Sequence, residues 1–225
     1  MGDRSADISL VRDYIVRFMP TATSALELGS GTGALLAGLA KDMAVTGVDQ
    51  SPEMLSIAAK KVPEATLVPG DIANFSLGTR FDVVICMFDT LNHVASFEGW
   101  LAVFERVHEH LVEGGLFIFD VNTIGRLRAL GHQQPYLQDF GEHTLIMDIT
   151  PTEGDVWLWE VKIFEHLDED LFRLHHEKIL ELGVPLERIR SALGVSFDLL
   201  DEMDQDSGSV SDESSRIYFA WRHRG

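Results

Sequence analysis

The sequence predicts an α/β fold in which helices cover both faces of a mostly parallel β-sheet. From Ser24 onward, short apolar runs alternate with amphipathic stretches, and each apolar run closes on Gly, Asp or Asn. The chain has 225 residues, of which 45% are hydrophobic, so it can bury a full core within one domain. We therefore predict a single domain over residues 1–225.

The predicted parallel strands are the apolar runs themselves. They are Ala25–Leu28, Val45–Val48, Thr66–Val68, Phe81–Phe88 and Leu116–Phe119. One intervening helix begins after Ser51, which can cap it, with Pro52 at the first helical position. Another runs from Phe97 to His110, where apolar residues recur at steps of three and four and so share one face. That face is expected to pack on the sheet.

After Asn122 the pattern changes to longer, partly alternating runs. These are Thr144–Ile149, Val156–Phe164 and Leu171–Leu180. They predict an antiparallel β insert over residues 140–182, with Trp157 and Trp159 on one face. The insert is either a cover over the ligand edge of the sheet or a dimer surface. The sequence does not decide between the two, so a homodimer is one of the possibilities. The last predicted elements of the chain are a helix at Pro185–Leu193 and two strands, at Val195–Leu200 and Ile217–Trp221.

The formal net charge of -18 limits the classes of partner. Nothing in the sequence resembles the basic surface that a phosphate backbone requires, so nucleic acids and anionic membranes are disfavoured. An acidic surface suits a cationic substrate, although solubility alone also explains acidity. The start of the chain has no signal-peptide pattern, no run is long enough for a membrane span, and the lone Cys86 lies in an apolar run. We expect a cytoplasmic protein.

A glycine-rich segment, Glu27–Gly33, follows the first predicted strand and opens a helix. Its glycines permit a tight turn and close approach of a ligand to the backbone. With Ala34 the segment also fits the G-x-G-x-x-G/A dinucleotide fingerprint, and Asp49 follows Gly29 at the spacing of about 20 residues expected of a ribose-binding acid. An NAD(P)-dependent oxidoreductase is therefore one candidate class.

Three features favour methyl transfer over hydride transfer. Glu27 would repel a dinucleotide pyrophosphate at this loop, whereas it would attract the cationic, amino-bearing end of S-adenosylmethionine. Asp71 and Ile72, after the third strand, can offer a carboxylate to an adenine amino group and a backbone amide to a ring nitrogen. The C-terminal strand pair closes the sheet differently from a dehydrogenase with a second catalytic domain, and the Tyr-x-x-x-Lys pairing of short-chain reductases does not occur.

In this order the motifs resemble those of class I S-adenosylmethionine-dependent methyltransferases, from Ala25 to Trp221. The matching segments are Glu27–Gly33, Gly47–Ser51, Pro69–Ile72, Phe81–Val84 and Glu113–Leu116. The resemblance implies a three-layer, Rossmann-like fold whose seven-stranded sheet has the order 3-2-1-4-5-7-6 with the seventh strand antiparallel, and it implies S-adenosylmethionine as cofactor. Met87–His93 is further similar to small-molecule N-methyltransferases, including those that act on glycine and on amino sugars.

The resemblance also implies roles along the cofactor edge. Asp49 would hold the ribose hydroxyls, Gly29 and Gly31 would line the methionine portion, and Glu27 would order the loop and the cofactor ammonium or only brace the loop. The full implied cofactor-binding set is Glu27, Gly29, Ser30, Gly31, Gly33, Asp49, Gln50, Met54, Asp71, Ile72, Met87 and Phe88.

Several members of this set have open alternatives. Gln50 and Met54 would flank the adenine, but Met54 equally suits helix-core filling. Met87 and Phe88 end the fourth strand, where an exposed carbonyl can meet a substrate ammonium, although their side chains equally suit packing.

Catalysis of methyl transfer requires mainly that nucleophile, carbon and sulfur be aligned and water excluded. A hydroxyl acceptor needs a positioned base, whereas an amine acceptor needs only to arrive neutral. His93 and Asp89 are the nearest candidates for that base, with Asn92 as a polar neighbour, and the alternative for His93 is capping or packing on the next helix. No metal site is predicted, because the histidines of the insert lack ligand spacing. They are His166, His175 and His176.

The sequence therefore favours a methyltransferase that moves the methyl group of S-adenosylmethionine to an amine or hydroxyl of a small molecule by direct displacement. Two alternatives remain. One is the NAD(P)-dependent oxidoreductase. The other is a nonenzymatic nucleoside-binding protein, because only a short segment precedes Ala25 where such enzymes often carry a lid.

Overall fold

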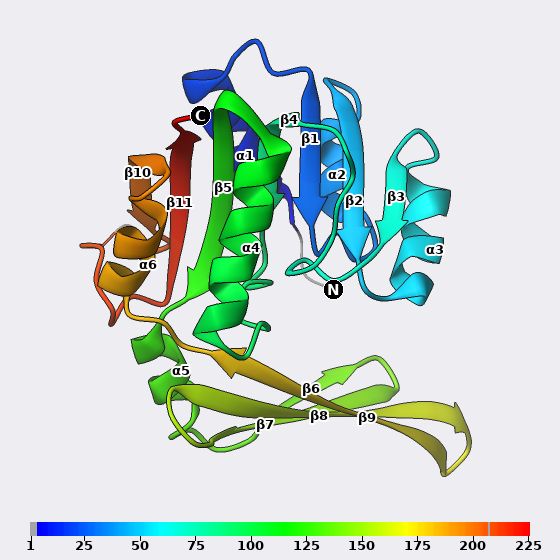
Figure 1. The fold of residues 1–225 in the computed structure, drawn as a ribbon. Helices are drawn as coiled ribbons and strands as arrows, with labels where there is room; N and C mark the ends of the chain where they lie inside the picture. Colours follow the sequence, from blue (N-terminus) through cyan, green and yellow to red (C-terminus); the bar gives the residue numbers. More distant parts are fainter. Residues whose placement is uncertain (1–3, 207) are drawn as a thin grey trace.

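The computed structural model describes residues 4–206 and 208–225. Figure 1 shows a large sheet between helices, with a smaller sheet lying across one end of it. The large sheet has the order β10-β11-β5-β4-β1-β2-β3. Its strands are β1 (Ser24–Leu28), β2 (Ala44–Asp49), β3 (Thr66–Pro69), β4 (Phe81–Cys86), β5 (Leu111–Asn122), β10 (Phe197–Asp204) and β11 (Arg216–His223).

The predicted strand order is confirmed. The first five strands pair in parallel, and β11 pairs antiparallel with both β5 and β10. In chain order this is 3-2-1-4-5-7-6 with the last strand reversed. Because β11 is reversed, its first residue lies at the edge where the parallel strands end.

Helices cover the two faces of the large sheet separately. One apolar core joins Val84 and Cys86 to α4 (Phe97–His110) and α6 (Leu186–Leu193). Val83 and Ile85 point to the other face and belong to a second core, which includes residues of two helices and Val62, the residue directly after a third. Those helices are α1 (Ser5–Phe18), α2 (Ala34–Leu39) and α3 (Pro52–Lys61). Among the described residues, no helix has both the length and the apolar character needed to span a bilayer.

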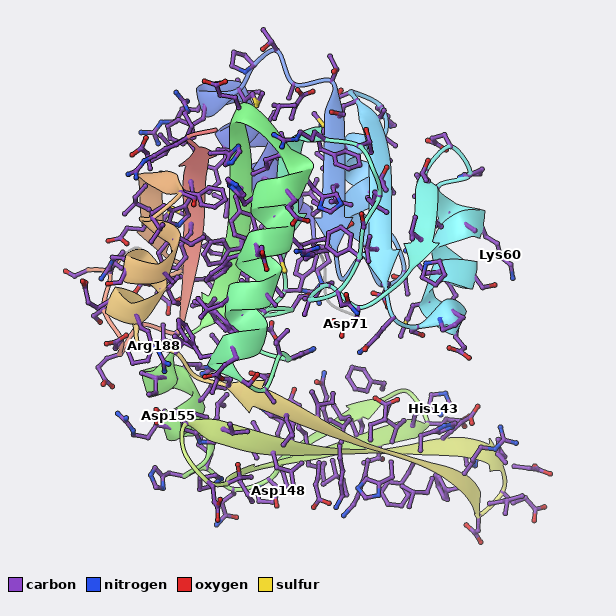
Figure 2. All side chains as sticks on the ribbon, in the orientation of Figure 1. Lys60, Asp71, His143, Asp148, Asp155 and Arg188 are labelled. Atoms are coloured by element: carbon purple, nitrogen blue, oxygen red, sulfur yellow. The ribbon has the colours of Figure 1, made fainter. Side chains whose placement is uncertain are left out.

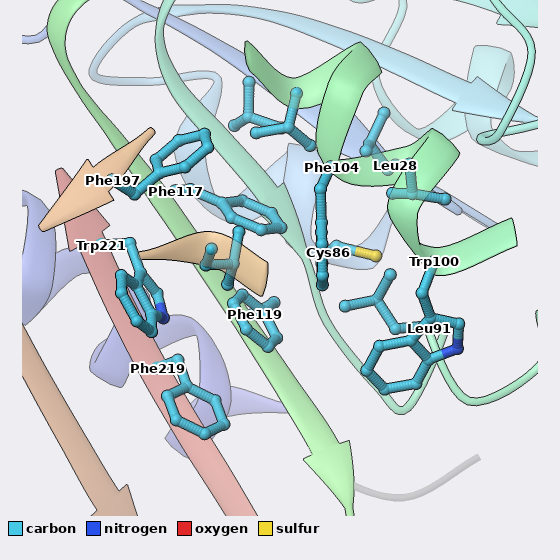
Figure 3. Close-up of a cluster of buried hydrophobic side chains, with 14 of the residues drawn as sticks. Leu28, Cys86, Leu91, Trp100, Phe104, Phe117, Phe119, Phe197, Phe219 and Trp221 are labelled. Atoms are coloured by element: carbon cyan, nitrogen blue, oxygen red, sulfur yellow. The ribbon is translucent and has the colours of Figure 1, made fainter. Parts of the chain in front are cut away.

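The helix α4 has the predicted bounds. The side chain of Ser96 caps it by accepting a hydrogen bond from the Gly99 amide at 3.1 Å. Its apolar face, which includes Trp100 and Phe104, is buried against the aromatic side chains of β5. Figure 3 shows this packing, in which Cys86 also lies buried as predicted. Each such large side chain contributes roughly 1.5–3 kcal/mol through burial.

The smaller sheet is the predicted antiparallel insert with one more strand. It has the order β6-β7-β8-β9, and its strands are β6 (Tyr136–Phe140), β7 (His143–Pro151), β8 (Val156–Asp168) and β9 (Leu171–Leu182). The predicted range, 140–182, leaves out most of β6, because this strand is short and largely exposed and carries no clear alternation. Trp157 packs with Ile149 against α5 (Ile124–Leu130), which joins the insert to the large sheet.

A pair of histidines lies near the amino ends of the parallel strands. His223 is 1% exposed, and its Nδ1 donates to the Val112 carbonyl oxygen at 2.9 Å. Its Nε2 is therefore left as an acceptor for His108 Nδ1, 2.7 Å away. This arrangement requires a neutral His223. Burial lowers the pKa of His223 below its ordinary value of 6.5, and the neighbouring His108 and Arg80 lower it further.

We expect acid to destabilise the protein through His223. Below pH 6.5 the unfolded chain binds a proton at this residue that the folded chain does not bind, so the free energy of unfolding falls as the pH drops through 6.5. Urea unfolding at several pH values between about 7.5 and 5.5 measures this slope. The slope should be flatter in His223→Gln and unchanged in His132→Gln, which alters an exposed histidine. Equal slopes in all three proteins would contradict the assignment.

Candidate active site

The glycine turn between β1 and α2 is held in the left-handed backbone region. Gly29 and Gly31 have φ values of 71° and 51°. A Cβ on Gly29 would lie 2.4 Å from Thr90 Cγ2, so close packing requires glycine there. A Cβ on Gly31 would meet nothing within 4 Å. The turn is therefore fixed by packing on one side and open at Gly31, where a ligand can approach the backbone.

Asp49 ends β2 directly beside this turn. Its Oδ2 accepts a hydrogen bond from the Gly31 amide at 2.7 Å, and its Oδ1 accepts one from the Ser51 amide at 2.9 Å. Each carboxylate oxygen can accept a second hydrogen bond. The two amides therefore fix the carboxylate while leaving acceptor capacity for a pair of hydroxyl groups.

Two buried polar atoms near the turn have no hydrogen-bond partner among the described residues. They are Glu27 Oε2 and Ser30 Oγ. Glu27 is 2% exposed, and this burial raises its pKa well above the ordinary range, with the charge of Asp49 adding to the effect. Buried polar atoms are normally satisfied, so the unpaired oxygen of Glu27 fits a ligand that brings an ammonium group to this turn.

The other predicted cofactor residues follow β2, β3 and α3. Gln50 and Met54 are exposed at the start of α3. Asp71 is exposed and accepts from the Ala73 amide at 2.9 Å, which shapes the turn after β3. Ile72 packs partly against the core. Figure 2 shows Asp71 at the end of the large sheet that faces the insert. Contacts of these side chains with a cofactor stay predictions.

Three residues of the predicted set are in contact with other parts of the chain. Gly33 precedes α2, and a Cβ on it would lie 3.0 Å from the Cβ of Ala58. Met87 is 1% exposed and packs in the core on the side of α1 and α2. Phe88 lies beneath the guanidinium group of Arg4, 4.0 Å from the ring centroid. These contacts do not test their predicted roles.

The chain leaves β4 through an unusual backbone turn. The run Phe81–Phe88 was predicted as one strand, but β4 ends at Cys86, and Phe88 and Asp89 have φ values of 66° and 54°. The cause is the carboxylate of Asp120, which accepts hydrogen bonds from both of their amides. The strand prediction is therefore wrong at its end, because a buried acceptor on β5 turns the chain.

Arg216 links this turn to the carboxyl end of β5. Its guanidinium group lies 2.6 Å from Asp120 and 2.5 Å from Asp89. Asp120 is fully buried, and burial raises its pKa to about 7 while Arg216 opposes the shift. The three side chains form one buried network that fixes Asp89 at the sheet edge.

His93 lies between two carboxylates. Its Nε2 is 3.6 Å from Asp89 and 3.7 Å from Glu181, which comes from β9 of the insert. Burial lowers the pKa of His93, but the hydrogen bonds and charges of Asp89 and Glu181 outweigh it and raise the pKa to about 9. Burial also raises the pKa of Glu181, although its side chain is bonded to His93 and Asn122. His93 is therefore an imidazolium at neutral pH.

The ligand atoms of Asp89, His93 and Glu181 are close enough together to bind a metal cation. Their ligand atoms lie within 4.8 Å of one another, although the sequence predicted no metal site. Arg216 already brings a positive charge to Asp89. Asn92, expected as a polar neighbour of His93, is instead fully buried and bonded to the backbone of β5 and β9. Its role is to hold the insert.

Sequence reasoning found Asp89 and His93 but missed three residues that act on them. Glu181 lies in a strand of ordinary composition, and Asp120 and Arg216 lie at the ends of strands far away in the chain. Of the three, only Asp120 could have been noticed in the sequence, because it is the acid that follows the apolar run Leu116–Phe119. Nothing local in the sequence indicates that Arg216 or Glu181 reaches the site.

Together, a glycine turn after β1, an acid ending β2 and a polar cluster after β4 form the arrangement expected of an α/β fold that binds a nucleoside at the carboxyl edge of its sheet. Residues 25–115 match the family described as methyltransferase domain. Together with the confirmed strand order, this match agrees with the class I S-adenosylmethionine-dependent methyltransferase fold that the motifs predicted. Binding of S-adenosylmethionine, the cofactor of that class, stays a prediction for this chain.

Two curated relatives are N,N-dimethyltransferases of nucleotide-linked amino sugars. The chain is 38% identical over 105 residues to dTDP-3-amino-3,6-dideoxy-alpha-D-glucopyranose N,N-dimethyltransferase of Streptomyces fradiae, covering 46% of this chain and 41% of the relative. It is 34% identical over 119 residues to dTDP-3-amino-3,4,6-trideoxy-alpha-D-glucopyranose N,N-dimethyltransferase of Streptomyces venezuelae, covering 52% and 50%. The matched part thus spans half or less of each relative.

A solved S-adenosylmethionine-dependent methyltransferase from Clostridium acetobutylicum is similar over the whole chain. The TM-score is 0.91 at 26% identity, and the match covers 100% of this chain and 93% of that one. The insert is therefore included in the similarity. The oxidoreductase alternative receives no support from these matches.

Removing Arg216 should strongly destabilise the protein. In Arg216→Met, the buried Asp120 loses its counter-charge, and we expect the free energy of unfolding to fall by roughly 3–5 kcal/mol. The control is Arg17→Met, which breaks the exposed ion pair with Asp201 and should change it by about 1 kcal/mol or less. Urea unfolding measures both. Similar losses in the two variants would show that the buried network is not a stabilising element.

The titration of His93 tests its two carboxylate neighbours. We expect its imidazole proton resonance to titrate near pH 9 in the unaltered protein. In Asp89→Asn and Glu181→Gln the midpoint should move down toward 6.5, because each variant removes a negative charge that stabilises the imidazolium. Glu177→Gln, on the same strand as Glu181, should leave it unchanged. The resonance is assigned by its absence in His93→Gln, and a midpoint near 6.5 in the unaltered protein would contradict the ion pairs.

Proposed function

We propose that this protein transfers the methyl group of S-adenosylmethionine to an amine of a small molecule. The observation that carries the proposal is the carboxyl edge itself, where the glycine turn and Asp49 lie on one side and His93 lies between Asp89 and Glu181 on the other. The two curated relatives are named for methylating amino groups on sugars.

The cofactor side of the proposal rests on complementary chemistry. The cofactor supplies an electrophilic methyl group when bound. Asp49, fixed by the amides of Gly31 and Ser51, would accept hydrogen bonds from the ribose hydroxyls. The unpaired oxygen of Glu27 would face the ammonium of the methionine part, directly or through water. Gly31 would allow the backbone to approach it.

The acceptor side favours an amine over a hydroxyl. An amine arrives at neutral pH largely as an ammonium ion, which carboxylates attract, and it must lose a proton before it can attack. His93, with a pKa of about 9, is already protonated at neutral pH, so the proton of the ammonium would pass instead to the carboxylate of Glu181, whose pKa burial raises, or to water. An alcohol holds its proton far more strongly than an ammonium ion does, and the protonated His93 cannot act as the base that a hydroxyl acceptor needs.

Binding of S-adenosylhomocysteine tests the cofactor half. We expect saturable binding by calorimetry to the unaltered chain and at least about tenfold weaker binding to Asp49→Ala, which loses the acceptor for the ribose hydroxyls. The control is Asp42→Ala, which removes an exposed carboxylate paired with Arg12. No binding to the unaltered chain would refute the proposed function. Unchanged binding to Asp49→Ala would refute the role of Asp49, which is the physical basis of the cofactor assignment.

The proposal extends to partners and location. We propose a cytoplasmic enzyme without a nucleic-acid or membrane partner, supported by the net charge of -18 and by the buried free thiol of Cys86, which suits a reducing compartment. A homodimer stays a prediction, and light scattering of the purified chain measures it directly. The cover role of residues 140–182 is also a proposal and depends on the contacts of Glu181.

A further inference from the structure

The insert turns one face toward the carboxyl edge of the large sheet. We call it the inner face, and it contains the residues on the same side as Trp157 and Glu181, which pair in register. Trp157 packs on α5, and Glu181 contacts His93 and Asn122. In Figure 2, His143, on the inner face, lies on the side toward the large sheet, and Asp148 lies on the opposite side.

The chemistry of the inner face changes along the strands. At the near end lies Glu181, which is almost fully buried. Next come pairs of apolar side chains across β7, β8 and β9, and the far end is charged. The apolar members are Leu145, Met147, Trp159, Val161, Ile163 and Ile179, and the far end has His143, Glu165, Arg173 and His175.

The apolar stretch is long enough for an extended body attached to an amine. Val161 lies four positions beyond Trp157, which corresponds to roughly 13 Å at about 3.3 Å per residue. Along this stretch, Trp159 and Met147 are half-buried and Ile163 is 41% exposed, so apolar surface remains accessible. The charged side chain within it, Glu177 opposite Val161, is another carboxylate.

A diphosphate is poorly suited to this surface. In a nucleotide-linked amino sugar, the diphosphate follows the amine after one sugar ring, so it would lie over Trp159 and Ile179 with carboxylates on either side. Anions placed there would be desolvated without a counter-charge. Arg216 is already bonded to two carboxylates. Arg173 is paired with Glu165 at 3.3 Å and lies roughly 26 Å along the strand from Glu181.

We propose that the methyl acceptor is an amine with an apolar, phosphate-free body, whose ammonium meets Glu181 and Asp89 while the body lies on the inner face of the insert. This inference rests on the proposed function and names its substrate class. It separates this chain from the curated relatives, which are named for nucleotide-linked amino sugars. Glu181 selects for the charge of the amine, and the inner face selects for its body.

The test uses the full chain saturated with S-adenosylhomocysteine and a series of primary amines, namely butylamine, hexylamine and octylamine. Calorimetry should give an affinity that rises by about twofold to fourfold for each added methylene group, because each is transferred from water to an apolar surface. A thymidine diphosphate-linked 3-amino sugar should bind at least about tenfold more weakly than octylamine. Transfer of a labelled methyl group from S-adenosylmethionine should follow the same order.

A matched pair of variants places the body on the inner face. Val161→Thr puts a hydroxyl into the apolar stretch without changing the volume, and it should weaken octylamine binding by roughly fivefold or more while leaving butylamine unchanged. Ile146→Thr also introduces a hydroxyl, with the loss of one methylene group, on the opposite face of β7 and should alter neither affinity. The thermal midpoints of both variants show whether each still folds as the unaltered chain does.

The outcomes separate the two proposals. If S-adenosylhomocysteine does not bind, the proposed function itself fails. If it binds but the amines do not bind, or their affinity is independent of chain length, the inference alone is overturned. Tighter binding of the nucleotide-linked sugar than of octylamine also overturns it, as does an equal effect of Val161→Thr and Ile146→Thr.

Discussion

The position of the insert relative to the turn after β4 depends on the side chain of Asn92. Its amide accepts a hydrogen bond from the Asn122 amide at 3.0 Å and donates to the carbonyl oxygens of Asn122 and Leu182, each at 2.9 Å. Its own carbonyl accepts from the Leu182 amide at 2.7 Å. One fully buried residue thus ties the turn after β4, the end of β5 and the end of β9 together. These bonds, with that of Asn122 to Glu181, hold Glu181 close to His93.

Sequence patterns predicted the regular parts of this fold because local chemistry decides them. A clear apolar periodicity predicted α4 with the bounds that the structure has, and the apolar runs placed all seven strands of the large sheet. The errors lie where distant residues override local preference. Asp120 ends β4 early by binding two amides, and β6 is paired by β7 although its own sequence has little strand character.

The candidate site divides in the same way. Its cofactor half comes from β1, β2 and the turns that follow them, so its motifs are short and could be read from the sequence. Its acceptor half combines Asp89 with Glu181 and Arg216, which meet only in the folded chain. The local sequence around the carboxylate of Glu181 or the guanidinium group of Arg216 does not indicate that these groups come close to Asp89 and His93 in the fold. The acceptor therefore had to be argued from contacts and surface chemistry.

The reversed direction of β11 has a consequence for biosynthesis. Arg216 is 127 positions after Asp89 and becomes available to it only when the final hairpin has left the ribosome. The glycine turn and Asp49 belong to the first strands to emerge, and chains fold from the N-terminus as they are made. The residues around the glycine turn are therefore synthesised well before the guanidinium group that holds Asp89 at the sheet edge.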